Sequence, residues 1–202
     1  MINNKKNSFQ VTRGSGILEL YLSKQRSKLA NKLIPASARE GRILDIGCGT
    51  YPYFLTQTKF QEKFGIDKNA LDVTQHQNMK IYKQGFEESF SIFSDNSFAI
   101  ITLLAVFEHF EPKNIAAVLK EIKRLLGTGG RFILTTPCPW ADPLLKLMAK
   151  IKLASPEEIN DHKRSYNHLQ LRNYLVQAGF DPQKIKNGYF ECYLNSWMFA
   201  DK

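Results

Sequence analysis

Hydrophobic and polar positions along the chain follow two alternating periods, one typical of helices and one typical of buried strands. Residues 16–33 place leucines on one helical face and lysines on another, which predicts an amphipathic helix that ends at Pro35. Residues 98–104 form a continuous apolar run, as expected of a parallel strand covered on both faces. Residues 115–126 repeat apolar side chains at helical spacing up to a glycine-rich turn at 127–130. The chain therefore passes repeatedly between helix and strand.

Shorter apolar runs predict the remaining elements of the same sheet. Further strands are expected at residues 42–46, 63–67, 80–83 and 131–136. A capping side chain followed by proline indicates helix starts at Asp142 and Ser155. Residues 169–176 predict a last helix that ends at Gly179, and the aromatic tail 184–200 has the pattern of a strand pair. Strands that alternate with helices favour an open, mostly parallel α/β sheet with helices on both faces.

The composition of the 202 residues is that of a globular protein, with 43% hydrophobic and 23% charged residues. A chain of this length fits a single domain with a substantial core. No apolar run approaches the roughly 20 residues that span a bilayer, and the first six residues lack the apolar core of a signal peptide. The three cysteines show neither zinc-ligand spacing nor a disulfide framework. These features favour a cytoplasmic, reduced protein without a metal site.

The net charge of +9 is concentrated near the N-terminus. Residues 1–42 carry nine basic and two acidic side chains, whereas residues 43–202 carry nineteen and seventeen. Such a basic segment would attract an anionic substrate, a membrane surface or nucleic acid. A solvated helix face explains the same pattern and is the more common case. The charge by itself does not choose a partner.

A glycine loop follows the first predicted strand, where ligands bind in open α/β sheets. In the segment Asp45-Ile46-Gly47-Cys48-Gly49-Thr50, two glycines let the backbone approach a ligand closely. Asp67 ends the second strand, where its carboxylate can accept hydrogen bonds from both hydroxyls of a ribose. A dinucleotide site would need a third glycine where this chain has Pro52, and Asp45 would repel a pyrophosphate. The loop therefore favours S-adenosylmethionine (SAM), a sulfonium with a free amino group, over NAD.

Further motifs occur in order between residues 42 and 180. They are Asp95-Asn96-Ser97-Phe98, Val106-Phe107-Glu108-His109-Phe110, Leu119-Lys120-Glu121-Ile122-Lys123-Arg124-Leu125-Leu126 and Gly129-Gly130-Arg131-Phe132-Ile133-Leu134-Thr135-Thr136-Pro137. With the glycine loop and Asp67, they resemble the class I SAM-dependent methyltransferases, in particular the branch with the ubiquinone and menaquinone biosynthesis enzymes and many small-molecule methyltransferases. The resemblance implies a Rossmann-like fold whose seven-stranded sheet has an antiparallel C-terminal strand.

The resemblance also implies that SAM is the cofactor and assigns roles to individual positions. The implied cofactor-binding residues are Asp45, Gly47, Cys48, Gly49, Asp67, Lys68, Phe86, Glu87, Leu104 and Ala105. The glycine loop would hold the amino-acid end of SAM, Asp67 the ribose, and the end of the fourth strand the methionine moiety. Lys68 would flank the adenine. Where the family usually has Gly-Asp after the third strand, this chain has Gly85-Phe86, so we expect Phe86 to pack on the adenine and Glu87 or the backbone to bind its amine.

The resemblance divides the single domain 1–202 into four parts. These are a basic amphipathic leading helix (1–40), a cofactor-binding core (41–137), a lid or substrate segment (138–168), and the last helix with the strand pair (169–202). The lid carries an apolar stripe of Leu144, Leu147, Met148 and Ile151. This stripe favours a hydrophobic acceptor, although a helix that merely packs on the sheet shows the same pattern.

Methyl transfer from a sulfonium needs alignment and exclusion of water, and a general base only where the acceptor must lose a proton. His162 precedes the last predicted helix and is our candidate for the base, since the ordinary pKa of histidine lies near 6.5. A loop histidine bonded to backbone is the alternative. The resemblance places His109 near the reactive methyl, with a structural tie to Glu108 as the other interpretation. Tyr51 and Tyr166 could line the acceptor pocket or belong to the core.

Two more segments allow a functional and a structural interpretation. Residues 13–16 combine an arginine with a helix start that could receive the SAM carboxylate, or could simply cap the helix. Cys138 invites comparison with the nucleophile of RNA cytosine-C5 methyltransferases, but their Pro-Cys after the fourth strand is Ala105-Val106 here. We therefore expect Cys138 to be structural. The acid-or-Asn-Pro-Pro-aromatic signature of amino-nitrogen methyltransferases is also missing.

The sequence thus predicts a SAM-dependent methyltransferase that acts on a small-molecule acceptor, either hydrophobic or anionic, at oxygen or carbon rather than nitrogen. Three alternatives stay open. They are an RNA-modifying methyltransferase that uses the basic N-terminal helix, an NAD-dependent oxidoreductase, and a SAM-binding protein without catalysis.

Overall fold

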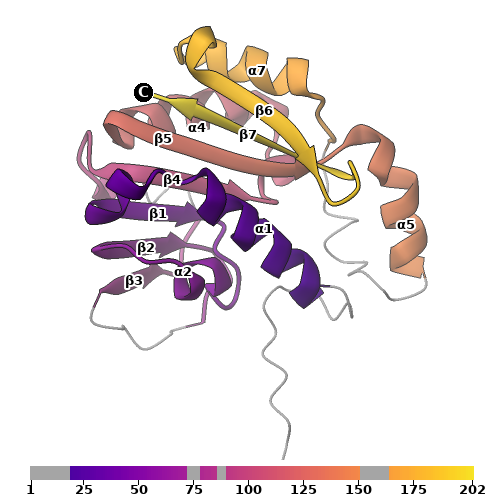
Figure 1. The fold of residues 1–202 in the computed structure, drawn as a ribbon, viewed down its shortest axis with the longest axis horizontal. Coiled ribbons are helices and arrows are strands. Elements are labelled where there is room, and N and C mark those ends of the chain that lie inside the picture. Colours follow the sequence, from indigo (N-terminus) through magenta and orange to yellow (C-terminus); the bar gives the residue numbers. More distant parts are fainter. Residues whose placement is uncertain (1–18, 72–77, 86–89, 151–163) are drawn as a thin grey trace, which may run out of the picture.

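A computed structural model describes residues 19–71, 78–85, 90–150 and 164–202. The described strands form a seven-stranded sheet in the order β3-β2-β1-β4-β5-β7-β6 (Figure 1). The strands are β1 (Arg42–Ile46), β2 (Glu62–Ile66), β3 (Met79–Tyr82), β4 (Phe98–Leu104), β5 (Leu126–Pro137), β6 (Ile185–Phe190) and β7 (Asn195–Asp201). Neighbours are parallel except that β7 runs antiparallel to both β5 and β6. The predicted mostly parallel α/β sheet with an antiparallel C-terminal strand is confirmed.

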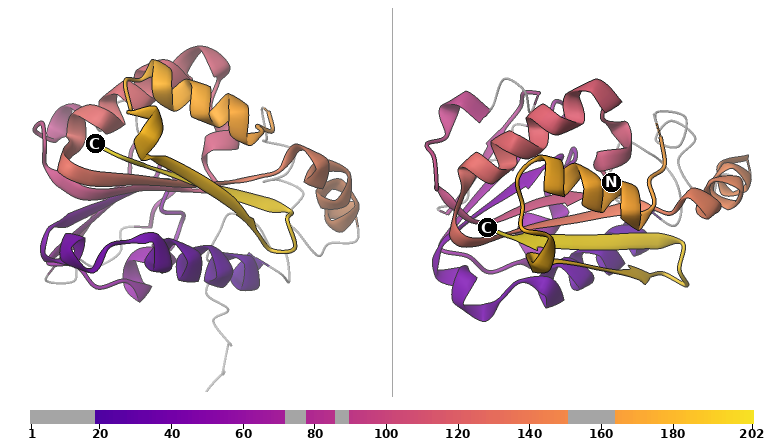
Figure 2. Two further views of the ribbon diagram at one scale, coloured as in Figure 1. Left: turned by 45° about the horizontal axis from the view of Figure 1, so that its top comes forward. Right: turned by 90° about the horizontal axis from the view of Figure 1, so that it is seen from above.

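Helices cover both faces of this sheet. The described helices are α1 (Glu19–Leu33), α2 (Tyr53–Gln57), α4 (Pro112–Leu125), α5 (Asp142–Lys150) and α7 (His168–Gln177). Short 3-10 turns are η1 (Ala36–Glu40), η2 (Phe90–Ile92), η3 (Phe107–His109), η4 (Pro139–Ala141) and η5 (Pro182–Lys184). Figure 2 shows α1 and α2 on one face and α4 and α7 on the other, whereas α5 stands beyond one end of the strands. None of the described helices is long and apolar enough to cross a membrane.

Two apolar clusters fill the space between the sheet and its helices. Alternate residues of one strand point to opposite faces, so Leu44 and Ile46 of β1 join the cluster under α4 and α7, while Ile43 joins the cluster under α1. The amphipathic pattern of α4 buries five side chains on the sheet: Ile115, Val118, Leu119, Ile122 and Leu125. Each fully buried side chain of this kind contributes about 1.5–3 kcal/mol relative to an exposed one. Burial on both faces explains why β4 reads as a continuous apolar run.

The junction of α4 and β5 differs from the sequence expectation. The glycine turn at 127–130 was expected to separate the helix from a strand beginning at residue 131, but β5 already begins at Leu126. Leu126 pairs with Phe98, and the register then shifts before Ile100 pairs with Arg131. The glycines therefore form an irregularity inside β5 rather than a separate turn.

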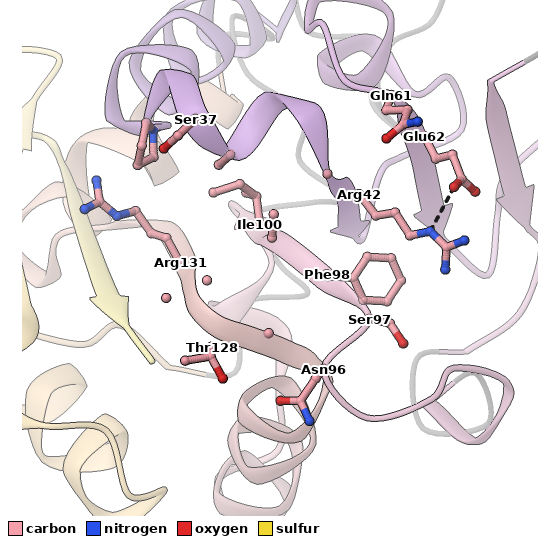
Figure 3. A pocket seen from close by; sticks show the side chains of 17 residues that line it. Ser37, Arg42, Gln61, Glu62, Asn96, Ser97, Phe98, Ile100, Thr128 and Arg131 are labelled. Atoms are coloured by element: carbon pink, nitrogen blue, oxygen red, sulfur yellow. Dashed lines mark hydrogen bonds and ion pairs between the residues drawn. The ribbon is translucent and has the colours of Figure 1, made fainter.

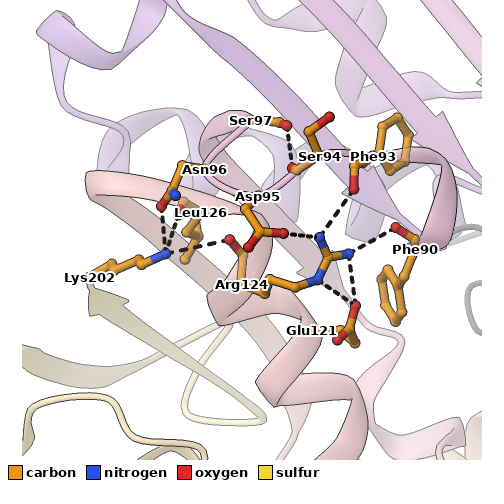
Figure 4. A network of polar contacts seen from close by, with 10 residues as sticks. All are labelled: Phe90, Phe93, Ser94, Asp95, Asn96, Ser97, Glu121, Arg124, Leu126 and Lys202. Atoms are coloured by element: carbon orange, nitrogen blue, oxygen red, sulfur yellow. Dashed lines mark hydrogen bonds and ion pairs between the residues drawn. The ribbon is translucent and has the colours of Figure 1, made fainter.

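A polar network holds the end of α4 against the start of β4 (Figure 4). Arg124 donates to Asp95 at 2.5 Å and to the carbonyl oxygens of Phe90 and Phe93 at 3.0 and 3.2 Å. Lys202 reaches the carbonyl oxygen of Leu126 at 2.6 Å through its ammonium group. Lys202 thus satisfies a carbonyl group at the end of α4, where the helix itself supplies no partner, and Arg124 joins this helix end to η2 and the segment before β4.

Candidate active site at the carboxyl edge of the sheet

The carboxyl ends of β1, β2 and β4 lie side by side at one edge of the sheet. Ile46 pairs with Ile66, and Asp45 pairs with Thr102, so these strands end close together. The glycine loop follows β1, Asp67 follows β2, and Ala105 follows β4. The parallel register thus brings three segments that are far apart in sequence to one place, the position at which open α/β sheets bind ligands.

The glycine loop requires its glycines. Gly47 and Gly49 have φ angles of +75° and +81°, a region that other L-residues enter only with strain. The amides of Gly47 and Cys48 both donate to the carbonyl oxygen of Ile66, at 2.8 and 3.2 Å. A Cβ atom on Gly47 would lie 2.4 Å from Val106 Cγ2, closer than any side chain tolerates. Conformation and close packing both exclude a side chain at this position.

Asp67 ties the second strand to the glycine loop. Its Oδ2 accepts from the amide of Gly49 at 3.0 Å, and its Oδ1 accepts from the amide of Asn69 at 2.7 Å. An ionised carboxylate has about four acceptor positions. Asn69 Nδ2 also donates to Oδ1, at 3.4 Å, so Oδ2 keeps a free position and a ligand hydroxyl at Oδ1 would displace this long contact. The side chain is only half-buried. It can therefore accept two hydroxyl groups of a ligand while it holds the loop in place.

Asp45 is a buried carboxyl with one strong partner. It is 3% exposed, and Thr102 Oγ1 donates to its Oδ1 at 2.6 Å. The pKa of Asp45 is raised to about 7, mainly by burial; the Thr102 hydrogen bond lowers it and the nearby charge of Asp67 raises it. Loss of hydration disfavours the ionised carboxylate of Asp45. A cation bound beside it would favour the ionised form, and the two opposite charges would stabilise each other.

The end of β4 is bent at a position that is not glycine. Ala105 has a φ angle of +57°, which costs on the order of 1 kcal/mol or more for a residue with a Cβ atom. Its amide donates to the carbonyl oxygen of Thr135 at 3.0 Å and to Thr135 Oγ1 at 3.1 Å. Leu104 beside it is half-buried. Strain of this kind collects at functional sites, where the surrounding structure keeps it in place.

The remaining predicted cofactor residues fall into three groups. The Cys48 side chain belongs to the cluster under α1, where burial raises the pKa of its thiol well above the usual range, and its Sγ donates to the carbonyl oxygen of Gly49 at 3.8 Å. Lys68 is exposed just beyond β2. Phe86, Glu87 and His162 lie outside the described residues, as do residues 13–16.

The turn after β4 contains a buried polar pair that the sequence did not reveal. Glu108 is buried in η3, and Thr136 Oγ1 donates to its Oε2 at 2.9 Å. His109 is half-buried beside it. The amide of Arg164 donates to the carbonyl oxygen of Glu108 at 3.4 Å, which brings the segment before α7 to this turn. Only the three-dimensional pairing of β4 with β5 places Thr136 beside Glu108.

Tyr166 and Cys138 belong to the core. Tyr166 is 2% exposed and packs edge-to-face against Phe107 and Tyr174, with ring centroids 5.2 and 5.9 Å away. Its hydroxyl has no hydrogen-bond partner among the described residues. Cys138 is buried at the end of β5, where burial raises its pKa to about 11 and keeps the thiol protonated. A nucleophilic role for Cys138 is not supported by this environment.

A cavity of about 500 Å³ lies at the other edge of the sheet (Figure 3). It is lined by the beginnings of β1, β4 and β5, represented by Arg42, Phe98 and Arg131. Arg131 is paired with Asp201 at 2.6 Å, and Arg42 with Glu62 at 2.9 Å. The cavity is thus separated from the glycine loop by the length of the strands. No cluster of three potential metal ligands occurs in the part of the chain that the structure describes.

The strand order, the antiparallel β7 and the loop with its two acids define the class I SAM-dependent methyltransferases. A family model described as a methyltransferase domain matches residues 18–185, and the chain belongs to this family. SAM is therefore the methyl donor, and the NAD-dependent alternative is set aside. The comparison with curated protein sequences finds no match.

Solved structures show the same fold. A SAM-dependent methyltransferase from Archaeoglobus fulgidus has a TM-score of 0.67 at 15% identity, over 91% of this chain and 94% of that one. A SAM-dependent methyltransferase from Thermotoga maritima, described as a possible histamine N-methyltransferase, has a TM-score of 0.68 at 17% identity, over 92% and 93%. One from Mesorhizobium loti has a TM-score of 0.65 at 16% identity, over 90% and 100%. At these identities the likeness concerns the fold alone.

Proposed function

We propose that this methyltransferase acts on a small-molecule acceptor and methylates oxygen or carbon rather than nitrogen. The carrying observation is the acidic, glycine-lined site at the carboxyl edge, where a cationic cofactor fits. The segment after β4 reads Ala105-Val106-Phe107-Glu108, without the Asn-or-acid-Pro-Pro pattern of amino-nitrogen methyltransferases. The assignment to the quinone-biosynthesis-like branch is part of this proposal.

The described residues fit SAM by their chemistry. Asp45, with the backbone of Gly47, Cys48 and Gly49, would hold the amino-acid end, since a cation offsets the cost of burying the Asp45 charge. Asp67 would accept the ribose hydroxyls with its remaining lone pairs. Asp45, the backbone of the glycine loop and Asp67 lie at the ends of the adjacent strands β1 and β2. Their closeness supports the proposal that they bind one ligand together.

The rest of the cofactor site follows the same proposal. Leu104 and Ala105 would line the methionine moiety at the strained end of β4. Lys68 would flank the adenine, and Phe86 and Glu87 would contact its ring and amine. The bound cofactor supplies a methyl group on a sulfonium. The chain contributes alignment of the acceptor and exclusion of water.

The histidines are candidates for a proton-accepting role. His162 is proposed as the general base and His109 as a residue near the transferred methyl. Alanine substitution of each should lower turnover at least tenfold while leaving SAM affinity within twofold of wild type. Full turnover in the His162→Ala variant would exclude His162 as the base.

The substrate side is proposed to be formed by the lid, residues 138–168. Trp140, Leu144 and Leu147 are exposed, which supports a hydrophobic acceptor. The experiment is a screen for SAM consumption with metabolite fractions separated by polarity. Turnover with a non-polymeric fraction supports the proposal, whereas turnover with RNA alone would contradict it.

The RNA alternative keeps one supporting observation. Lys24, Lys28 and Lys32 are all exposed along α1. If they bind a phosphate backbone, RNA affinity must fall steeply with salt, because bound phosphates release counterions. Substitution of the three lysines by glutamine should then abolish RNA binding without changing SAM affinity.

A further inference from the structure

Four aromatic rings gather at the carboxyl edge outside the cofactor loop. Tyr189 near the end of β6 lies at the centre, with ring centroids 5.5 Å from Trp140, 4.3 Å from His168 and 5.6 Å from Tyr193. We call Trp140, Tyr189 and Tyr193 the aromatic cluster. Their exposed fractions are 52%, 41% and 68%, whereas large aromatic residues are usually well buried. His168 stacks on Tyr189 at an interplanar angle of 24° and backs the cluster from α7.

The aromatic cluster is held in a fixed arrangement. Trp140 Nε1 donates to the carbonyl oxygen of Tyr193 at 2.9 Å, which locks the indole ring to the β6–β7 turn. His168 Nε2 contacts the carbonyl oxygen of Gly188 at 3.2 Å. Burial lowers the pKa of His168, so the backing ring is uncharged near neutral pH and donates this hydrogen bond. Fixed, exposed rings can stack on a ligand with little loss of side-chain freedom.

The cluster is continuous with the proposed substrate side. Trp140 follows β5 directly through η4, and the amide of Cys138 donates to the carbonyl oxygen of Leu194 at 2.9 Å. Pro137, the last residue of β5, pairs with Asn195 of β7. Figure 1 shows the β6–β7 turn and α5 at the end of the sheet toward which β1 and β4 run. The rings thus lie at the rim of the edge that carries the cofactor loop.

The turn between β6 and β7, which carries Tyr193, has a strained backbone that lowers the stability of the fold. Glu191, Cys192 and Tyr193 have φ angles of +50°, +54° and +66°, without a glycine or asparagine among them. Hairpin turns with this geometry strongly prefer those two residues. The Glu191 Oε1 atom is also buried without a hydrogen-bond partner among the described residues. Both the positive φ angles and the buried Glu191 oxygen destabilise the fold. Strain of this kind is common at functional sites, so it points to a function for this turn.

The charges around the rings distinguish between possible ligands. Lys or Arg side chains lie over Phe60, Phe64, Phe180 and Phe199 within 6.0 Å. In the described part of the chain, no such side chain lies over a ring of the aromatic cluster. The charge of Arg26 acts on the Glu191 carboxyl in the adjoining turn, so charges of both signs lie near the rings. The rings themselves carry no stacked cation, which favours a ligand held by ring stacking over one held by charge.

We propose that Trp140, Tyr189 and Tyr193 bind the methyl acceptor and that this acceptor contains a flat aromatic ring. The inference rests on the proposed small-molecule methyl transfer and names the substrate class of that site. The rings would hold the acceptor by stacking, with offset or edge-on geometry. The cofactor contacts of Asp45 and Asp67 remain separate from this surface.

The test measures binding of 1-naphthol by calorimetry in the presence of S-adenosylhomocysteine. Saturable binding is expected for the wild type, with at least tenfold weaker binding for Trp140→Leu and for Tyr193→Gly. Cys192→Gly is the matched control, because it relieves the same left-handed backbone without removing a ring. It should bind 1-naphthol within twofold of wild type and melt at a higher temperature. The saturated analogue decahydro-1-naphthol should bind at least tenfold more weakly than 1-naphthol.

Several results would overturn the proposal. They are no saturable 1-naphthol binding by a protein that binds SAM, unchanged binding by both ring variants, or equal binding of the saturated analogue. Salt-sensitive binding of oligouridylate that is lost with Trp140 would assign the cluster to RNA instead. A dimer in light scattering that Trp140→Leu dissociates would assign it to a protein interface. Turnover with RNA alone would be a failure of the proposed function, and the screen for SAM consumption detects this separately.

Discussion

At the scale of single residues, Asp45 affects both the free energy of unfolding and the proposed binding of SAM. The carboxyl is buried, has one hydroxyl donor from Thr102, and has a pKa raised to about 7. Between about pH 4 and 7 the folded protein therefore holds a proton that the unfolded chain has released. The free energy of unfolding falls as the pH rises through this window and levels off above about pH 7.

Asp45→Asn should remove this pH dependence. The amide keeps an acceptor for Thr102 and carries no charge, so the variant should be more stable than wild type at pH 8 by about 4 kcal/mol, since a pKa raised from near 4 to about 7 corresponds to about 1.4 kcal/mol for each pKa unit. At pH 4 the two proteins should differ by less than about 0.5 kcal/mol from this cause. Urea unfolding at the two pH values measures both differences.

Asp45→Asn should also bind SAM more weakly than wild type, so the substitution that stabilises the fold should impair cofactor binding. An Asp45→Asn variant whose stability relative to wild type is the same at pH 4 and pH 8, or one that binds SAM as tightly as wild type, would contradict the role given to Asp45.

Tyr166 is a second buried residue whose substitution should not destabilise the fold, because its hydroxyl has no hydrogen-bond partner among the described residues. A buried hydroxyl without a hydrogen bond has lost its hydration without compensation. Tyr166→Phe should therefore leave the free energy of unfolding unchanged or raise it by up to about 1 kcal/mol. Thermal unfolding with Tyr174→Phe as a control measures this. A loss of more than about 1 kcal/mol would show that the hydroxyl is bonded.

The proposed cofactor-binding residues were the easiest to find from the sequence, since each lies at the end of a strand. Asp45, Gly47 and Asp67 follow recognisable strands, and a parallel sheet gathers such ends automatically. The inward direction of Cys48 and the pairing of Glu108 with Thr136 were not predictable. They depend on packing and on a strand register that connects residues 28 positions apart.

At the scale of elements, the strands and long helices were predictable because their apolar periods are strong. The irregularity in β5 and the left-handed turn between β6 and β7 were not. A glycine run normally ends a helix, but Leu126 continues directly into pairing with β4. In the turn, Glu191, Cys192 and Tyr193 contradict the local preference, so no local signal could reveal it.

Arg124 provides a prediction at this scale, because it joins α4 to the segment that leads into β4. It is partly buried and donates to two backbone carbonyls besides its acidic partners. Arg124→Met should lower the free energy of unfolding by about 1–3 kcal/mol, since the carbonyls lose a charged donor.

The matched control is Arg42→Met, which removes the more exposed ion pair with Glu62. Exposed pairs of this kind contribute about 0–1 kcal/mol. Equal losses in the two variants, measured by urea unfolding, would show that the network around Arg124 is not a structural tie.

At the scale of the whole molecule, a basic protein presents an acidic site. The chain carries a net charge of +9, yet the ionisable groups at the ends of β1 and β2 and in η3 include Asp45, Asp67 and Glu108. Local charge, rather than net charge, decides which cofactor a buried site accepts. This contrast supports the proposal that the glycine loop holds the amino-acid end of SAM and would repel a pyrophosphate.

The central claim is that Asp67 and the glycine loop hold SAM, and calorimetric titration tests it most directly. Wild type should bind SAM and not NAD. Asp67→Ala should weaken SAM binding at least about tenfold, because two hydroxyl contacts to a charged acceptor are lost. Asp181→Ala, an exposed acid that caps η5, should bind SAM like wild type. NAD binding without SAM binding, or equal SAM affinity in the Asp67→Ala variant and wild type, would contradict the account.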